Sequence, residues 1–309
     1  MMKIIFNESR QIYISMINKV QDYIEKHLDE ELTVELLAGI ASFSSFHFQR
    51  IYRQITGESL YSYIKRLRLE KAAFLLATNN NRTIQDIALS LGYSNQSSFA
   101  KAFKNKFGMN ASKFRILSEN DRMKIIDNIN NAHDSTNGKV YDKEIDYTTP
   151  MELSVQIIKP TKVVYIRHTG SYKGDSNLFE QLFTKLYSYT SSLDIVKKDS
   201  KWFVAYHDFG DLTMEEQLRL SVCMSIDSDV RTNGEFGSMI LEGGKYAVGR
   251  FALKPDGYQL AWNYMLSKWL PESGYVPDDR VFFEYYPPED NINHKEEKIV
   301  EIFIPIIPL

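Results

Sequence analysis

The sequence Thr33-Val34-Glu35-Leu36-Leu37-Ala38 returns fifty residues later as Thr83-Ile84-Gln85-Asp86-Ile87-Ala88. One residue is inserted before Phe99, where the match with Phe48 resumes. Each copy has the pattern of a helix, a tight turn and a second helix that ends at a glycine. This spacing predicts two helix-turn-helix units in the first 117 residues of the chain.

Local signals support both units. Thr33 and Thr83 stand where helix N-caps belong, because each precedes a run with helical apolar spacing. Gly92 suits a left-handed turn between the two helices of the second unit, and Ser42 holds the equivalent place in the first. A helix predicted over 60–76 joins the two units and would hold them at a fixed separation.

The second helix of each unit, predicted over 45–54 and 95–106, has an aromatic stripe on one side and polar side chains on the other. Such polar side chains hydrogen-bond base edges or phosphates. The alternative is that these polar residues form an ordinary solvent-exposed helix face. The presence of two copies in the same register favours DNA binding. The candidate DNA-binding residues are Ser45, Phe46, Gln49, Arg50, Arg53, Asn95, Gln96, Ser97, Lys101 and Lys104.

Charge separates the two halves of the chain. Residues 10–117 hold 15 Lys and Arg against 9 Asp and Glu, although the whole chain carries a formal charge of −3. The basic excess therefore lies in the half with the helix-turn-helix units, where phosphate attraction is needed.

Residues 10–117 resemble the DNA-binding domain of AraC/XylS-type transcription regulators. The resemblance rests on the stretch Gly92-Tyr93-Ser94-Asn95-Gln96-Ser97-Ser98-Phe99-Ala100-Lys101-Ala102-Phe103-Lys104-Asn105-Lys106-Phe107-Gly108. It implies a seven-helix fold with both recognition helices in adjacent major grooves of promoter DNA, and RNA polymerase as a partner. Two departures are Asn110-Ala111 in place of the usual Pro-Pro or Thr-Pro and Lys101 where many relatives have Arg. Because Lys cannot fork onto guanine, the second unit is expected to contact phosphate more than bases.

Length and composition restrict the remaining possibilities. At 309 residues the chain is expected to form two domains, and it contains no apolar run long enough to span a membrane. A single cysteine, Cys223, and the lack of a signal-peptide pattern indicate a cytoplasmic, nucleoid-associated protein. No metal-ligand or nucleotide-binding motif is present, so no cofactor is expected. The residues do not indicate an oligomeric state.

The second half, 150–309, follows a polar stretch at 118–149 that is predicted to be a flexible linker. It contains two successive units with the pattern strand, strand, helix, strand, strand. The predicted strands lie over 153–159, 162–167, 202–207, 217–226, 238–242, 245–251, 281–286 and 299–306, and the helices over 177–189 and 257–270. The alternation over 217–226 predicts one apolar and one polar face for that strand. The two units would form a sheet with helices on one face and a concave ligand site on the other.

Within this half, Glu284 is the principal candidate for ligand binding. In Val281-Phe282-Phe283-Glu284-Tyr285-Tyr286 it lies on the same strand face as Phe282 and Tyr286. A carboxylate buried among aromatic rings is costly unless it neutralises a bound cation, to which the rings add cation–π attraction. The alternative is that Glu284 faces solvent or pairs with a nearby Lys or Arg.

Residues 151–309 resemble the GyrI-like small-molecule-binding domain. The resemblance rests on Tyr165-Ile166-Arg167-His168-Thr169-Gly170-Ser171-Tyr172, on Gly243-Gly244-Lys245-Tyr246-Ala247-Val248 and on Glu301-Ile302-Phe303-Ile304-Pro305-Ile306, together with the Glu284 strand. It implies a duplicated β-α-β-β (SHS2-like) domain in which the residue matching Glu284 contacts cationic, aromatic ligands, as in multidrug sensing. Tyr246 and Phe303 fall where pocket aromatics lie, and Tyr286 is a candidate because it shares the strand face of Glu284. Tyr165, Trp262 and Tyr206 are weaker candidates, for which a core role is at least as reasonable.

The combined interpretation is an all-α DNA-binding domain followed by an α+β effector domain, which make up a one-component transcription regulator and not an enzyme. Activation is expected because most relatives with this domain order activate transcription. One alternative is a small-molecule hydrolase that uses Glu284 as a base. The other is a DNA-binding protein whose second domain only recruits a partner.

Overall fold

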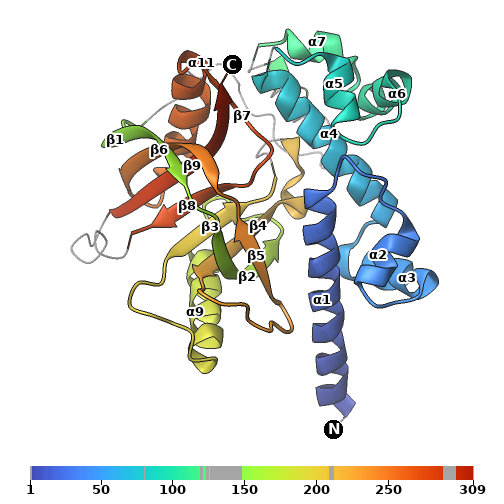
Figure 1. The fold of residues 1–309 in the computed structure, drawn as a ribbon, viewed down its shortest axis with the longest axis vertical. Helices are drawn as coiled ribbons and strands as arrows, with labels where there is room; N and C mark the ends of the chain where they lie inside the picture. Colours follow the sequence, from blue (N-terminus) through green and yellow to red (C-terminus); the bar gives the residue numbers. More distant parts are fainter. Residues whose placement is uncertain are drawn as a thin grey trace. The chain divides into compact units, whose positions relative to one another are not determined.

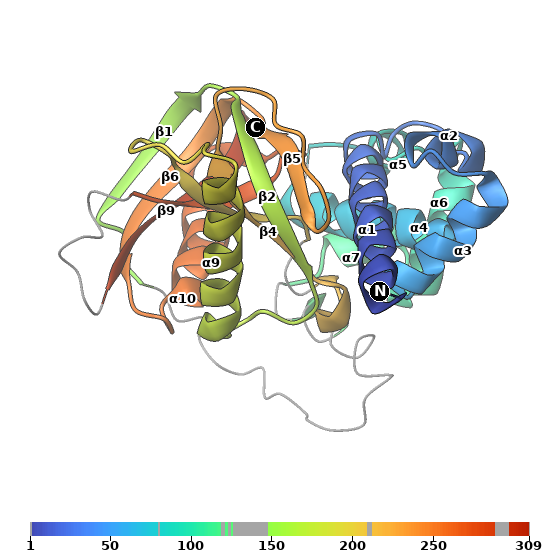
Figure 2. The ribbon, with the colours of Figure 1, turned by 90° about the horizontal axis from the view of Figure 1, so that it is seen from below.

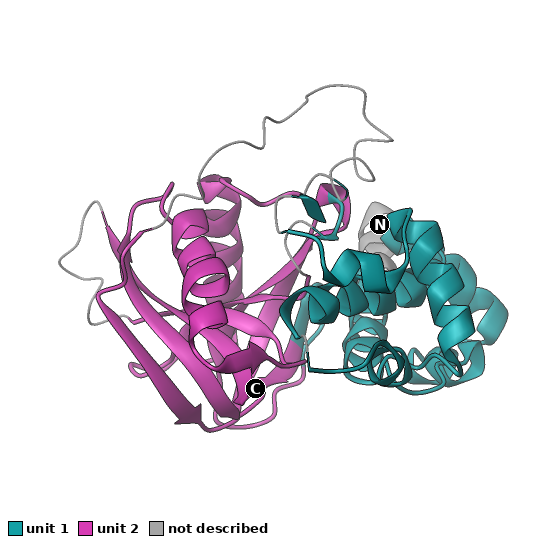
Figure 3. Cartoon of the chain, turned by 90° about the horizontal axis from the view of Figure 1, so that it is seen from above, with its two compact units in different colours: residues 1–141, 209–214, 232–237 teal, residues 142–208, 215–231, 238–309 magenta. Residues whose placement is uncertain are grey.

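The computed structural model describes residues 2–79, 81–118, 121, 122, 125, 148–208, 212–287 and 297–308. They divide into two compact units, which are coloured separately in Figure 3. Unit 1 comprises 1–141 with the short segments 209–214 and 232–237, and unit 2 comprises 142–208, 215–231 and 238–309. The predicted linker at 118–149 lies almost entirely outside the described residues. Within the described part of the chain, no helix is both long and apolar enough to cross a membrane.

Unit 1 contains the predicted pair of helix-turn-helix units on either side of a long central helix (Figure 1). Helices α2 and α3 pack near one end of α4, and α5, α6 and α7 pack near the other. The bounds are α1 Met2–Lys26, α2 Val34–Ile40, α3 Ser45–Thr56, α4 Leu60–Thr78, α5 Ile84–Leu89, α6 Gln96–Phe107 and α7 Ala111–Arg115. The core has one cluster for each helix-turn-helix unit, the second of which includes Phe99, Phe103, Phe107 and Phe114.

The predicted caps and turns of unit 1 are confirmed. The side chain of Thr33 accepts a hydrogen bond from the amide of Leu36, and Thr83 forms a reciprocal capping box with Asp86. Gly92 and Ser42 both have positive φ, 71° and 56°. Sequence alone therefore located both turns, including the one that a serine occupies.

One arginine ties the second turn to the rest of unit 1. Arg68 of α4 donates from Nε to the carbonyl of Leu28 at 2.9 Å, from Nη2 to that of Glu30 at 2.7 Å and from Nη1 to that of Gly92 at 3.3 Å. A Cβ on Gly92 would lie 2.4 Å from Nη2 of Arg68 and 2.7 Å from the Leu28 carbonyl oxygen. The absence of a side chain at this position is therefore what allows the close approach.

Replacing Gly92 by Ala is expected to destabilise unit 1 by about 2–4 kcal/mol, because left-handed strain adds to the clash with Arg68. Gly39→Ala is the matched control, since Gly39 lies in helix α2 and a Cβ there meets nothing within 4 Å. That control is expected to be neutral or stabilising by about 0.5–1 kcal/mol. Thermal unfolding followed by helical circular dichroism measures both, and equal melting temperatures for the two variants would contradict the argument.

Unit 2 is built on one twisted antiparallel sheet (Figures 1 and 2). Its strands are β1 Glu152–Ile158, β2 Thr161–Thr169, β3 Trp202–Tyr206, β4 Arg219–Ser225, β5 Phe236–Leu241, β6 Gly244–Leu253, β8 Phe282–Tyr286 and β9 Lys298–Pro308. The short β7, Tyr275–Pro277, which the sequence did not predict, pairs with β9. The helices are α9 Ser176–Ser192, α10 Tyr258–Asn263 with its continuations η3 Tyr264–Trp269 and α11 Leu270–Glu272, and the short η2 Glu215–Gln217.

The order of the strands is β1-β6-β9-β8-β3-β4-β2-β5. This order is symmetric. Exchanging β1 with β5, β2 with β6, β3 with β8 and β4 with β9 gives the same order read from the opposite end. Strands β8 and β3 meet at the centre, where Glu284 is paired in register with Val204. In each set of four strands, β1–β4 and β5–β9 without β7, the first strand pairs with a strand of the other set. Strand β1 pairs with β6, and β5 pairs with β2.

The face of β4 that the alternation predicted to be polar is buried. Arg219, Ser221 and Cys223 are buried, as are Leu220 and Val222 on the other face. The reason is that β4 lies inside the sheet and is covered on both sides. Helix α9 packs against β4. On the face that carries Cys223, this residue joins an aromatic cluster with Tyr165, Phe203, Phe283 and Phe303.

Candidate functional site

The candidate DNA-binding residues lie on the exposed faces of α3 and α6. Phe46, Gln49, Arg50 and Arg53 are exposed on α3, and Ser45 is half-buried at its first position. Gln96, Ser97, Lys101 and Lys104 are exposed on α6. Phe46 is 83% exposed although it is a large apolar residue, which sets it apart from the buried Phe48 on the opposite side of the same helix.

Four cations on these helices have no ion-pair partner among the described residues: Arg50, Arg53, Lys101 and Lys104. Their charges are therefore available to phosphates. Asn95 has a structural role as well, because its side chain caps α6 by accepting from the amide of Ser98 at 2.8 Å. Both recognition helices thus present polar, positively charged outer faces while aromatic residues hold their inner faces in the core.

The second candidate site is a buried carboxylate in unit 2. Glu284 on β8 is fully buried and accepts three hydrogen bonds from aromatic side chains. Its Oε1 accepts from the indole Nε1 of Trp262 at 2.7 Å, and its Oε2 accepts from the hydroxyls of Tyr206 at 2.9 Å and Tyr286 at 2.6 Å. Within the described part of the chain, no lysine or arginine pairs with it.

This environment changes the acid–base properties of the site. Burial raises the pKa of Glu284 above its ordinary value, and the three hydrogen bonds only partly oppose this. Burial and the adjacent carboxylate raise the pKa of Tyr206 and of Tyr286 well above 10. Burial also raises the pKa of Tyr258, the first residue of α10, to about 12. The phenols thus stay protonated as donors to the carboxylate.

Aromatic rings surround this carboxylate on the helix side of the sheet. Trp262 on α10 stacks on Phe282 with an interplanar angle of 9° and meets Tyr206 edge to face. From α9, Phe183 contacts Tyr286 and Trp202 at ring-centroid distances of 5.7 and 6.0 Å. The sheet face away from the helices, where the sequence predicted a concave ligand site, therefore does not carry the Glu284 side chain.

The structure does not bring Tyr165, Tyr246 and Phe303 together with Glu284. Phe303 is the register partner of Phe283, the neighbour of Glu284, and therefore lies on the opposite face of the sheet. Tyr165 and Tyr246 are buried in the same cluster as Phe283. Arg280 lies over the Tyr246 ring at 4.5 Å, and Arg167 lies over the Tyr165 ring at 4.9 Å. Of the predicted effector residues, the structure gathers Glu284, Tyr286 and Trp262.

Tyr206 donates to Glu284, although the sequence indicated it only as a weaker candidate for the effector site. Tyr258 was not among the predicted site residues. The last residue of β3 reaches Glu284 only because β3 pairs with β8, and that pairing joins residues almost eighty positions apart. No local pattern reports such a pairing. A signal that was available is the alternation of Trp202, Val204 and Tyr206, which puts two aromatic residues on one face of the strand.

Comparisons with known proteins match both halves. Residues 151–307 match the model of the GyrI-like small molecule binding domain, and residues 37–116 match that of a helix-turn-helix domain. Residues of this chain are 36% identical to the Transposon Tn10 TetD protein of Escherichia coli over 108 residues, which cover 35% of this chain and 78% of TetD. The chain belongs to the AraC-type regulators and carries a GyrI-like domain.

Transcriptional regulator Rob of Salmonella typhimurium is 36% identical to this AraC-type chain over 97 residues, which make up 31% of the chain and 33% of Rob. The matched part thus spans about a third of Rob's length. A similar solved structure is the C-terminal domain of AraT, a response regulator from Geobacillus stearothermophilus. It is 31% identical and covers 34% of this chain and 88% of its own, with a TM-score of 0.32. The family resemblances seen in the sequence are confirmed.

Proposed function

We propose that this AraC-type regulator is a one-component sensor that activates transcription when an amphipathic, aromatic cation binds at Glu284. The observation that carries the proposal is a fully buried carboxylate held by three neutral donors and surrounded by aromatic rings. An uncompensated buried charge costs several kcal/mol, and a bound cation would offset that cost. The surrounding rings would add cation–π attraction.

The place of Glu284 in the sheet also favours a ligand site. We infer that unit 2 arose by duplication of a β-α-β-β element, which the symmetric strand order supports. Glu284 and Tyr206 lie on β8 and β3, where the two halves would meet. Ligand sites commonly form at such junctions.

The experiment that tests ligand sensing is a tryptophan-fluorescence titration of the full chain. Trp202, Trp262 and Trp269 are the only tryptophans, all of them lie in unit 2, and Trp262 itself donates to Glu284. Tetraphenylphosphonium, a neutral aromatic compound and an aromatic anion serve as probes. Saturable quenching by the cation alone is expected, and an equal response to all three would contradict a carboxylate-based site.

For the DNA-binding half, we propose that α3 reads bases through Phe46, Gln49 and Arg50, while Ser45 and Arg53 contact the backbone. In the second helix-turn-helix unit, α6 carries lysines and no arginine. We therefore expect contacts mainly to phosphates from this unit, through Asn95, Gln96, Ser97, Lys101 and Lys104. RNA polymerase is the proposed partner in activation. The DNA contacts are supported by four cations of α3 and α6 that have no ion-pair partner among the described residues.

Replacing Arg50 by Ala is expected to weaken binding to a duplex selected by the full chain from a random pool by about 5- to 150-fold, the loss typical of one good base contact. Lys197→Ala removes the same charge from an exposed position in unit 2 that pairs with Asp227, so it is the matched control. Fluorescence anisotropy with labelled DNA measures both affinities. If the two variants lost affinity equally, general charge and not the α3 surface would account for binding.

A hydrolase that uses Glu284 as a base is the second candidate, and the raised pKa of this carboxyl is the observation in its favour. Turnover of a reactive ester or amide probe by the wild type that disappears in Glu284→Gln would support it. Binding of the cation without any product would favour the sensor.

A further inference from the structure

A short segment from the second half of the sequence belongs to the helical unit. Residues 209–214 are part of unit 1, and their described members are Leu212, Thr213 and Met214. Leu212 packs against the core cluster that includes Phe103 and Phe107 of α6. Thr213 is only 2% exposed. This segment is therefore built into the core of the second helix-turn-helix unit.

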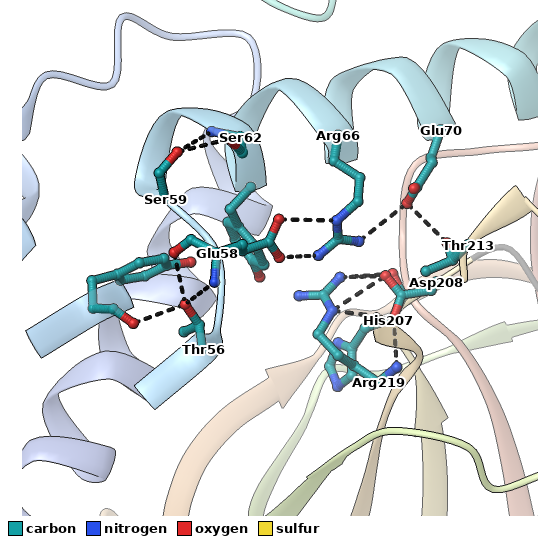
Figure 4. A network of polar contacts seen from close by, with 12 residues as sticks. Thr56, Glu58, Ser59, Ser62, Arg66, Glu70, His207, Asp208, Thr213 and Arg219 are labelled. Atoms are coloured by element: carbon teal, nitrogen blue, oxygen red, sulfur yellow. Dashed lines mark hydrogen bonds and ion pairs between the residues drawn. The ribbon is translucent and has the colours of Figure 1, made fainter. Parts of the chain in front are cut away.

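Thr213 hydrogen-bonds to a buried carboxylate on the central helix. Its Oγ1 donates to Oε2 of Glu70 at 2.8 Å (Figure 4). Glu70 is 3% exposed and also accepts from Nζ of Lys106 at 2.7 Å and from Nη1 of Arg66 at 3.4 Å. A carboxylate with this degree of burial depends on such partners, so each of them affects its position.

Glu70 is connected to both helix-turn-helix units. Lys106 lies in the last turn of α6, the second recognition helix. Arg66 also donates from Nη2 to Oε1 of Glu58, which follows α3, at 2.6 Å (Figure 4). A shift of Glu70 would therefore change the orientation of α6 relative to α3, and that geometry determines whether both helices can enter successive major grooves.

The other end of the same segment continues into unit 2. After Met214 the chain passes through η2 to Arg219, the first residue of β4. Arg219 is held by Asp208, with Nη2 and Oδ1 2.6 Å apart. Asp208 follows Tyr206 by two residues, and Tyr206 donates to Glu284. Both ends of the segment are thus anchored by buried polar contacts, one near the candidate ligand site and one at Glu70.

We propose that Thr213 is a positioning residue for DNA recognition, which couples the state of the Glu284 site to the orientation of α6 through Glu70 and Lys106. This inference rests on the proposed function and specifies how its two activities communicate. Because coupling is reciprocal, DNA bound at α6 must also change the affinity of the Glu284 site for its ligand. Since the proposed coupling acts through the chain from Thr213 to Asp208 and Tyr206, DNA alone should also change the surroundings of Glu284 and can test the coupling without any effector.

The experiment compares the full-length wild type with Thr213→Val and Thr213→Ser. Valine has nearly the same shape but no hydroxyl, whereas serine keeps the donor to Glu70. Each protein is titrated with the selected duplex while anisotropy of labelled DNA reports binding and tryptophan emission reports unit 2. All three proteins are expected to bind DNA. The DNA-induced change in tryptophan emission should be present in the wild type and Thr213→Ser and lost in Thr213→Val.

A second arm adds tetraphenylphosphonium. It is expected to change the DNA affinity of the wild type and of Thr213→Ser by about fivefold or more, and to leave that of Thr213→Val unchanged. The inference is overturned if Thr213→Val keeps the tryptophan response to DNA, or if the wild type binds DNA without any such response. Failure of the proposed function has a different signature, since the wild type would then bind no selected duplex or no cation, and that result would overturn both.

Discussion

Glu284→Gln is expected to weaken the binding of tetraphenylphosphonium by about 10- to 100-fold. Gln keeps the shape of the side chain but cannot carry the charge, and an interaction with a charged group contributes about 1.5–3 kcal/mol. Tryptophan fluorescence measures the affinity. Binding by the variant at wild-type strength would show that Glu284 does not act as the counter-charge.

Glu301→Gln is the matched control for this substitution. Glu301 lies on the neighbouring strand β9 and already pairs with Arg250 at 2.5 Å. Its replacement removes the same formal charge from the same sheet, so the variant should bind the cation as the wild type does. A similar loss in both variants would indicate a long-range charge effect and would count against a specific site.

Lowering the pH is expected to weaken cation binding by the wild type but not by Glu284→Gln. Since burial raises the pKa of Glu284 above 4.5, the folded protein holds this proton more tightly than the unfolded chain does. The corresponding stability is fully present below the unfolded pKa and is lost as the pH rises through the folded pKa. Over the same window the carboxylate becomes charged and cation affinity increases. Glu284→Gln should show neither dependence.

Asp208→Asn is expected to destabilise unit 2 by about 3–5 kcal/mol. Both side chains of the Asp208–Arg219 pair are 1% exposed, and Asp208 accepts four hydrogen bonds from the backbone amide and guanidinium of Arg219. Removing the carboxylate takes away these four hydrogen bonds and the negative charge that faces a buried guanidinium. Urea unfolding followed by tryptophan fluorescence measures the free energy of unfolding of this unit.

Two further variants complete this test. Asp227→Asn breaks the exposed pair with Lys197 and is expected to leave the urea midpoint nearly unchanged, because solvent screens such pairs. The double replacement Asp208→Leu with Arg219→Met removes both charges and should restore much of the lost stability, because buried ion pairs can often be exchanged for apolar residues. If Asp208→Asn unfolded at the wild-type urea concentration, the pair would have no stabilising role.

The helical unit was largely predictable because its signals are local. Thr33 and Thr83 predict the helix caps that they form, and Gly92 predicts the turn in which it lies. In the sheet, strand positions were predictable but their neighbours were not. Whether Phe303 or Tyr246 shares a face with Glu284 depends on register between distant strands, and one residue of shift exchanges the faces.

Buried polar pairs were also hidden from the sequence. The alternation of Arg219, Ser221 and Cys223 with apolar residues is the pattern of a half-exposed strand, yet β4 is buried on both faces. Its arginine is compatible with burial only because Asp208 lies opposite. The Thr213–Glu70 contact joins residues more than 140 positions apart, which no local pattern can report.

The exchange of β1 and β5 between the two strand sets has a consequence during protein synthesis. Strand β1 pairs with β6, which is made about 100 residues later. At 5–20 residues per second, β1 therefore waits roughly 5–20 s on the ribosome without its partner. Helices α1 to α7 have all been made by then and pair with close neighbours in the chain, whereas Leu212 and Thr213 join unit 1 only later. The nascent protein thus has its recognition helices in place while Val155 and Ile157 are still unpaired, and the sheet can close only after the final strands emerge.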